Sequence, residues 1–120
     1  MRAIVTAELR RFANTCIWSW QGWSAAWASE KSLRQWTVVN LASATLAFAL
    51  DLSAGERAMI LALGLLILAA ELFNTAIEEI VDLASPERDP RAGKAKDCGS
   101  AAVAATAIAG GVAWLVVLLG

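Results

Sequence analysis

The feature that most limits how this chain can fold is a set of three long uncharged runs, at residues 36–50, 58–70 and 100–119. A helix that crosses the roughly 30 Å of hydrocarbon in a bilayer needs about 20 mostly apolar residues. Hydrophobic residues make up 58% of the 120 residues, more than a soluble domain of this length can bury. We therefore expect an all-α membrane protein, one domain over residues 1–120, with transmembrane helices at about 35–52, 58–81 and 99–119.

Residues 3–28 predict a further helix that is amphipathic. Apolar residues recur every three or four positions from Val5 to Trp27, and Arg2, Glu8 and Arg11 lie between them. A tryptophan-rich apolar side opposite a charged side is typical of a helix that lies in the headgroup plane. Packing of the same helix on the protein's own core is a compatible interpretation.

Basic residues set the expected orientation, because cytoplasmic flanks collect Lys and Arg. Five precede the first predicted span and four lie in 85–97, a segment with two prolines that we predict to be a charged loop. The connection at 51–57 has only Arg57. We therefore expect a multi-pass protein of the bacterial inner membrane, with the N-terminus and the 83–98 loop in the cytoplasm and the C-terminus outside.

Four polar residues predict a stripe along the second span. At about 100° and 1.5 Å per residue, Glu71, Asn74, Glu78 and Asp82 share one helix face over roughly 16 Å. Glu71 lies deepest in the hydrocarbon, where a carboxylate persists only if it faces protein or water. A helix–helix hydrogen bond or a buried ion pair is the simpler explanation, but a row of polar groups favours a functional site.

Oxygen ligands and basic residues near the cytoplasmic boundary indicate what the site could bind. Glu30 and Glu78 could hold a hard divalent cation such as Mg²⁺, although sequence spacing alone does not bring them together. The basic residues of 85–97 could meet phosphate, or could simply be solvated or face lipid headgroups; they are Arg88, Arg91, Lys94 and Lys96.

Several classes of function are excluded or disfavoured. The chain has no histidine, so acid–base chemistry must rest on other groups. Its net charge of −1 predicts no nucleic-acid partner. Neither G-x-x-x-x-G-K-[ST] nor G-x-G-x-x-G is present, so a nucleotide would bind without these phosphate loops. We expect Cys16 and Cys98 to stay reduced, and we expect no signal peptide.

The motif E-x-x-N-x-x-x-E at Glu71–Glu78, followed by K-D-x-G-S at residues 96–100, resembles the bacterial integral-membrane diacylglycerol kinases, a family that also includes undecaprenol kinases. The resemblance extends over almost the whole chain, including residues 25–30 and Arg34-Gln35. It implies a homotrimer of three-span protomers, each with a surface helix, in which neighbouring subunits share active sites.

The resemblance also implies roles for single residues. Glu71 is similar to the general base that activates the lipid hydroxyl, Asn74 to its polar partner, and Glu30 and Glu78 to the ligands of the Mg²⁺ that accompanies ATP. Other positions similar to those that contact the nucleotide are Arg11, Trp18, Glu87, Arg88, Asp89, Lys96 and Asp97. Positions similar to those along the lipid groove are Arg11, Trp20, Ala26, Trp27, Arg34 and Ser100.

The chain departs from the usual family pattern at Trp18, Gln21 and Trp36. The favoured prediction is ATP-dependent phosphorylation of diacylglycerol to phosphatidic acid. Undecaprenol is the alternative within the same chemistry, because both lipids are apolar chains that end in a hydroxyl. A small proton-coupled multidrug transporter and a purely structural membrane-surface protein are alternatives from other classes.

Overall fold

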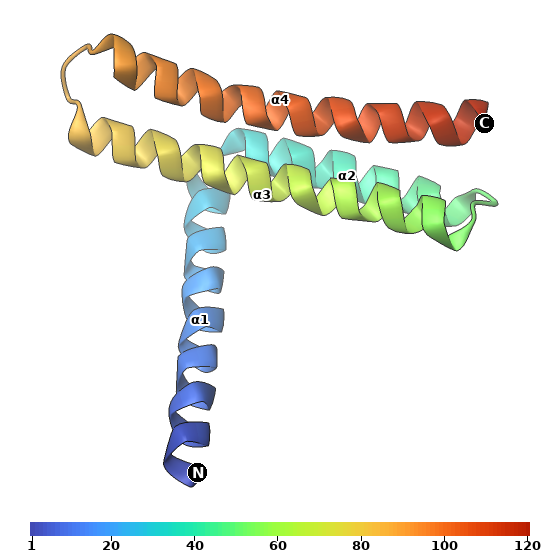
Figure 1. The fold of residues 1–120 in the computed structure, drawn as a ribbon. Coiled ribbons are helices and arrows are strands. Elements are labelled where there is room, and N and C mark those ends of the chain that lie inside the picture. Colours follow the sequence, from blue (N-terminus) through green and yellow to red (C-terminus); the bar gives the residue numbers. More distant parts are fainter. The chain divides into compact units, whose positions relative to one another are not determined.

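The computed structural model describes residues 1–120, and every regular element in it is a helix (Figure 1). The helices are α1 (Arg2–Ser29), α2 (Lys31–Ala49), α3 (Ala54–Ala84) and α4 (Pro90–Leu119). They form two compact units, residues 1–30 and residues 31–120. The predicted all-helical class is therefore confirmed.

The first unit is the single helix α1, which ends where Glu30 adopts an extended conformation. Thr6, Thr15 and Ser24 each donate a hydroxyl hydrogen bond to the carbonyl four residues earlier. Hydroxyls bonded in this way present little polarity to the surroundings. Almost all of its side chains are exposed, and Ala26 is buried.

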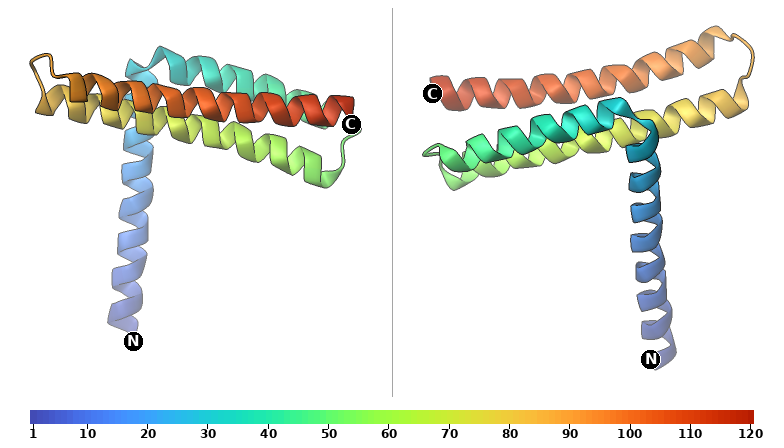
Figure 2. Two further views of the ribbon diagram at one scale, coloured as in Figure 1. Left: turned by 45° about the horizontal axis from the view of Figure 1, so that its top comes forward. Right: turned by 180° about the vertical axis from the view of Figure 1, so that it is seen from behind.

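In the second unit α3 is the central helix, and it packs against both α2 and α4 (Figures 1 and 2). α3 and α4 run antiparallel, so the C-terminus lies near the connection between α2 and α3. Two helices, α3 and α4, are long and apolar enough to cross a membrane. α2 was also predicted to span the membrane, but it is not among the helices that are apolar enough to do so. Its mean hydropathy is lowered by Arg34, Gln35 and Asn40.

Two glycines allow close packing of α2 on α3 and of α3 on α4. A Cβ on Gly64 of α3 would collide with the Asn40 side chain of α2, and a Cβ on Gly99 of α4 would collide with the Asn74 side chain of α3. Small residues at helix contacts are typical of membrane bundles, where packing replaces the hydrophobic effect as the force between helices. Each close contact also buries an amide group.

The connection between α2 and α3 is shorter than the 51–57 segment predicted, because only residues 50–53 are non-helical. Ser53 and Glu56 form a capping box: the Ser53 hydroxyl accepts from the Glu56 amide at 3.3 Å, and the Glu56 carboxylate accepts from the Ser53 amide at 2.7 Å. These hydrogen bonds lower the pKa of the Glu56 carboxyl group. The helix therefore starts at Ala54, and α2 ends at Ala49 instead of residue 52.

The predicted loop over residues 85–97 (83–98 at its widest) is wrong in its second half, because only residues 85–89 are non-helical. Asp89 caps α4 by accepting from the Arg91 amide at 2.8 Å, and Pro90 occupies the first helical turn. Proline suits this position because its fixed φ matches the helix and the missing N–H has no helical partner. Lys94 and Lys96 therefore lie on a helix.

Arg57 joins the ends of α2 and α3. Its Nε donates to the Ala47 carbonyl at 2.9 Å, its Nη2 donates to the Leu52 carbonyl at 3.2 Å, and its guanidinium lies 5.2 Å from the centre of the Phe48 ring. The guanidinium satisfies carbonyls left unpaired by the end of α2.

We predict that Arg57→Met lowers the free energy of unfolding by about 2 kcal/mol, since part-buried hydrogen bonds from a charged donor are lost. Arg57→Lys should be intermediate, because an ammonium keeps the charge but not the forked geometry. Thermal unfolding in detergent measures the effect, with Arg2→Met at an exposed position as the control. Equal stability of the Arg57→Met and Arg2→Met variants would contradict this role.

Candidate functional site

The predicted polar stripe lies on α3, and its deepest member is almost completely enclosed. Glu71 is the one buried charged side chain of the chain, with 4% of its surface exposed. The Ser32 hydroxyl, in the first turn of α2, donates to Oε2 of Glu71 at 2.9 Å. A buried carboxylate requires such partners, because water is not available to it.

One turn further along α3, the Asn74 side chain is hydrogen-bonded to the Glu78 carboxylate. Its Nδ2 donates to Oε1 of Glu78 at 3.0 Å, while its Oδ1 is buried without a partner beside Gly99. Buried acceptors are nearly always satisfied in folded proteins, so an unmet oxygen indicates a missing donor or cation. The carboxylate of Glu78 and this amide oxygen are hard ligands of the kind that Mg²⁺ prefers.

The outer end of the stripe joins α3 to α4. Nζ of Lys96 lies 2.5 Å from Oδ1 of Asp82. The hydrogen bond to Asp82 raises the pKa of the Lys96 ammonium, which also feels the charge of Glu78. Lys96 is therefore positively charged at neutral pH. In the adjacent loop, the hydrogen bonds from Arg91 lower the pKa of the Asp89 carboxyl group.

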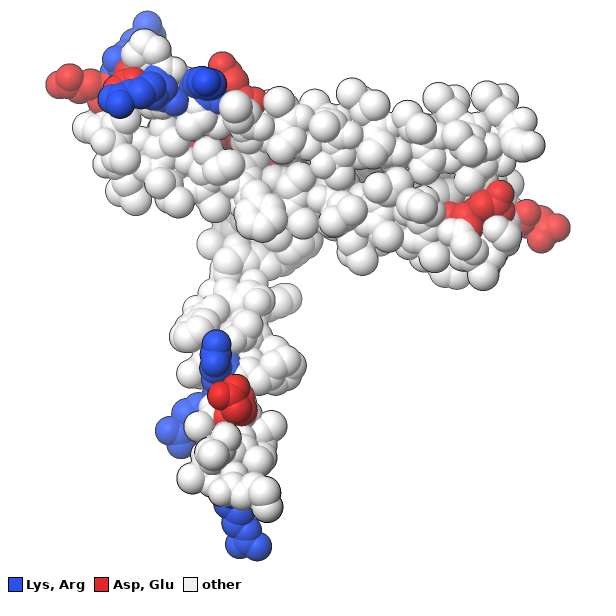
Figure 3. Space-filling view, in the orientation of Figure 1, with Lys and Arg blue, Asp and Glu red and all other residues white.

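Charged residues gather where α3 and α4 are joined (Figure 3). A cavity of about 520 Å³ lies there, and its charged lining residues are Asp82, Glu87, Arg88, Asp89 and Lys96. Its size and mixed charge suit a polar ligand with both phosphate and cationic parts. Four residues predicted to contact a nucleotide are thus brought together: Glu87, Arg88, Asp89 and Lys96.

The other predicted site residues do not line this cavity. Asp97 and Ser100 are exposed on α4, and Arg34 is part-buried on α2. The first unit carries the rest. There Arg11, Trp18, Trp20 and Trp27 are exposed, Ala26 is buried, and Glu30 accepts from the Ser29 hydroxyl at 2.9 Å. No cluster of three or more His, Cys, Asp or Glu side chains forms a ready-made metal site.

The sequence is similar to those of known proteins over almost its whole length. The sequence profile of the prokaryotic diacylglycerol kinases matches residues 17–118. The chain belongs to the prokaryotic diacylglycerol kinase family. The predicted resemblance is confirmed, and with it the class of enzyme, a lipid kinase.

Individual members of the kinase family are similar over nearly their full length. A diacylglycerol kinase of Pseudomonas aeruginosa is 46% identical over 114 residues, which cover 93% of this chain and 91% of that protein. One from Escherichia coli K12 is 34% identical over 113 residues, covering 94% and 93%. One from Haemophilus influenzae is 32% identical over 109 residues, covering 91% and 92%.

Two residues of interest in this kinase were not singled out from the sequence. Ser32 lies 39 residues from the carboxylate that it contacts, and Asn40 lies against Gly64 on a different helix. No helical periodicity links positions on separate helices. The available signal is that Ser32, Trp36 and Asn40 recur every four residues, which places a hydroxyl and an amide on one face of α2.

We predict that Asp82→Asn lowers the pKa of Lys96, because the hydrogen bond and the negative charge that stabilise its ammonium are both weakened. The fraction of charged Lys96 then falls at a lower pH than in the unchanged protein. NMR titration of ¹³C-dimethylated lysines measures this shift, and the signal of Lys94 provides an internal reference. An unchanged Lys96 titration would contradict the ion pair.

Proposed function

We propose that this chain transfers the γ-phosphoryl group of ATP to a membrane lipid alcohol, and that the alcohol is diacylglycerol and the product phosphatidic acid. The observation that carries the proposal is the buried Glu71 carboxylate, whose Oε2 accepts a hydrogen bond from the Ser32 hydroxyl. In the proposed reaction the other carboxylate oxygen accepts the substrate hydroxyl. The name shared by the relatives supports the choice of diacylglycerol.

In the proposed reaction, Glu71 is the general base and Asn74 is its polar neighbour in the catalytic site. The carboxylate of Glu71 takes the proton of the lipid hydroxyl as the oxygen forms its bond to the γ-phosphorus. The bond between that phosphorus and the bridging oxygen breaks, and ADP leaves with the electron pair. Such transfers depend mainly on positioning and on neutralising charge.

Glu30 and Glu78 are the proposed ligands of Mg²⁺, one from each unit of the chain. When bound, the ion neutralises the charge on the ATP phosphates. Two features of Asn74 support a cation at this position along the stripe: its Oδ1 is unpaired, and its Nδ2 is hydrogen-bonded to Glu78. Asn74 keeps the Glu78 carboxylate in one orientation, which is what a cation with strict geometry requires.

The proposed nucleotide contacts are the loop and α4 residues Glu87, Arg88, Asp89, Lys96 and Asp97, together with Arg11 and Trp18 of the surface helix. The open, charged cavity beside the α3–α4 loop supports this placement. The proposed lipid groove uses Arg11, Trp20, Ala26, Trp27, Arg34 and Ser100. Arg34 and Glu71 belong to neighbouring helices that pack together, which supports a common site.

The proposed setting is the bacterial inner membrane, with three spans, the N-terminus and residues 83–98 in the cytoplasm, and the C-terminus outside. α2 supports a third span, since 19 helical residues extend about 28 Å and α2 packs along α3. The cluster of basic residues at the α3–α4 loop supports the orientation. We also propose a homotrimer with shared sites, formed through the small residues of α4.

Undecaprenol remains the alternative substrate, because the base and its partner would act on any lipid hydroxyl in the same way. Membership of a kinase family favours phosphoryl transfer over proton-coupled drug transport. The hydrogen bond between Ser32 of α2 and Glu71 of α3 is what a purely structural role predicts, so membership of the kinase family is what favours a functional role for Glu71.

We predict that Glu71→Gln lowers kcat about 1,000-fold, because an amide cannot accept the proton. The assay is transfer of ³²P from ATP to diacylglycerol in mixed micelles with Mg²⁺. Glu79→Gln, five residues beyond Asn74 and exposed, is the matched control and should keep its activity. Lipid kinase activity in Glu71→Gln equal to that of the control would rule out this base.

We further predict that Ser32→Ala lowers kcat about tenfold, since Glu71 loses the donor that fixes its orientation. The KM for ATP should not change. Ser32→Thr should restore most of the rate, because it keeps the hydroxyl, and Thr45→Ala on the exposed side of α2 is the control. A fall in kcat that Ser32→Thr fails to reverse would show that the hydroxyl is not what matters.

A further inference from the structure

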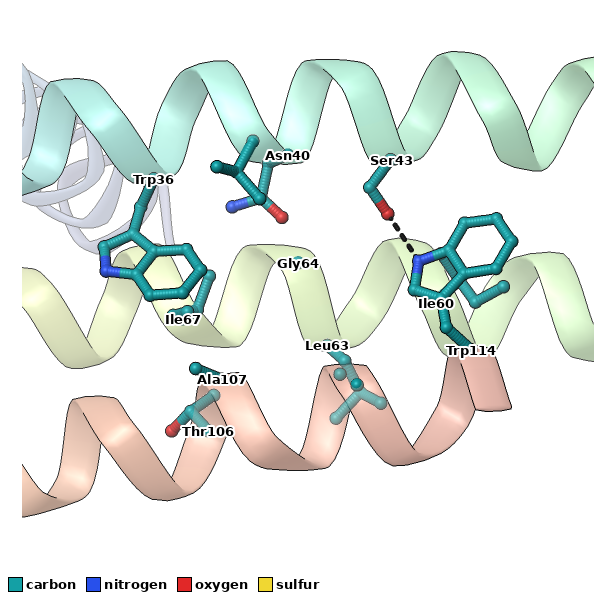
Figure 4. Close-up of a pocket in the computed structure, with 13 residues that line it drawn as sticks. Trp36, Asn40, Ser43, Ile60, Leu63, Gly64, Ile67, Thr106, Ala107 and Trp114 are labelled. Carbon is teal, nitrogen blue, oxygen red and sulfur yellow. Dashed lines mark hydrogen bonds between the residues drawn. The ribbon is translucent and has the colours of Figure 1, made fainter. Parts of the chain in front are cut away.

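A second cavity, of about 250 Å³, lies between α2, α3 and α4 (Figure 4), and its α3 residues all precede Glu71 in the helix. An indole stands at each end: Trp36 at the end near Ser32, and Trp114 at the far end, where its Nε1 donates to the Ser43 hydroxyl at 2.9 Å. Ile67, one turn from Glu71 on the same face of α3, belongs to the wall. The cavity therefore ends about one helical turn from the proposed catalytic base.

Most of the lining is apolar, and small residues create the space. Gly110 and Gly111 of α4 line the cavity, and a Cβ on either would meet no atom within 4 Å. Apolar cavities of roughly 150 Å³ already bind small hydrocarbons. A space of this size and lining suits part of a lipid.

One polar atom in the cavity has no partner. Nδ2 of Asn40 is buried and unbonded, while Oδ1 of the same amide packs against Gly64. The nitrogen points toward the Trp36 end of the cavity (Figure 4). A buried donor without an acceptor is destabilising, so a ligand that brings an acceptor to this position would be bound favourably.

The direction of the side chains brings this amide toward the base. Gly64, against which Asn40 packs, lies seven residues from Glu71, or about 10 Å along α3. Side chains on a helix lean toward its N-terminus, and α2 and α3 run in opposite directions. Asn40 therefore leans toward the end of α2 at which Ser32 holds the Glu71 carboxylate.

We propose that Asn40 Nδ2 donates a hydrogen bond to an ester carbonyl of the lipid alcohol whose hydroxyl lies at Glu71, with the adjoining acyl chain in the cavity between Trp36 and Trp114. This inference rests on the proposed function and narrows its substrate class. Diacylglycerol carries a carbonyl only a few bonds from its hydroxyl. A polyprenol has no acceptor other than the hydroxyl itself, so it leaves the amide unmet.

The test compares a diester glycerol with a diether glycerol of the same chain length, which lacks only the carbonyls. The unchanged protein should show a kcat/KM about tenfold higher for the diester, because a site built to bond a carbonyl discriminates against an analogue without it. Asn40→Leu should remove this preference by lowering the diester value, and should leave the diether and polyprenol values unchanged. Thr45→Val, exposed on the same helix, is the control.

Gly64→Ala supplies a second variant in case Asn40→Leu folds poorly, because the new Cβ displaces the Asn40 amide without removing it. It should also abolish the preference for the diester. Equal kcat/KM for the two glycerols in the unchanged protein, or a preference that survives both substitutions, would overturn the inference while leaving the kinase proposal intact. Failure of the unchanged protein to phosphorylate any of the three lipids would instead overturn the proposed function.

Discussion

The structure depends on the enclosure of one carboxylate by apolar helices. Glu71 lies near the middle of the longest helix of the chain, and only 4% of its surface is exposed. A charge at that depth is strongly unfavourable in lipid, so the helices beside α3 must supply its partners. Ser32 does so from the first turn of α2. This requirement fixes the register of α2 on α3 and explains the polar residue in the first turn of α2.

The packing of the other polar groups follows the same principle. Asn40 and Asn74 each lie against a glycine of the next helix, and each keeps one amide atom unpaired. In Asn74 the unpaired atom is the oxygen that packs against the glycine, whereas in Asn40 the oxygen packs against the glycine and the nitrogen is unpaired. The Asn74 amide lies toward the charged loop, and the Asn40 amide lies in the apolar cavity. We infer that the two amides serve two ligands, a cation with its nucleotide at the outer position and a lipid at the inner one.

Sequence periodicity was sufficient for the helices and for the polar stripe, because residues 71, 74, 78 and 82 share one helix and need no tertiary contact to be aligned. The extent of the α3–α4 loop was predicted wrongly, since both prolines of residues 85–97 were assigned to the loop, whereas Pro90 begins α4. Ser32 and Asn40 were missed because their roles arise only when α2 packs on α3. The links from Glu30 and the surface helix to the stripe, and the third span, stay predictions.

The central claim is that the stripe from Glu71 to Asp82 faces a protein cleft that admits both a lipid hydroxyl and a nucleotide. The most direct measurement is an experimental structure in a lipid bilayer with diacylglycerol, Mg²⁺ and a non-hydrolysable ATP analogue. The account predicts the lipid hydroxyl within hydrogen-bonding distance of the Glu71 carboxylate and the phosphates beside Glu78 and Lys96. A Glu71 side chain that faces acyl chains, with the lipid hydroxyl and the nucleotide bound elsewhere, would contradict it.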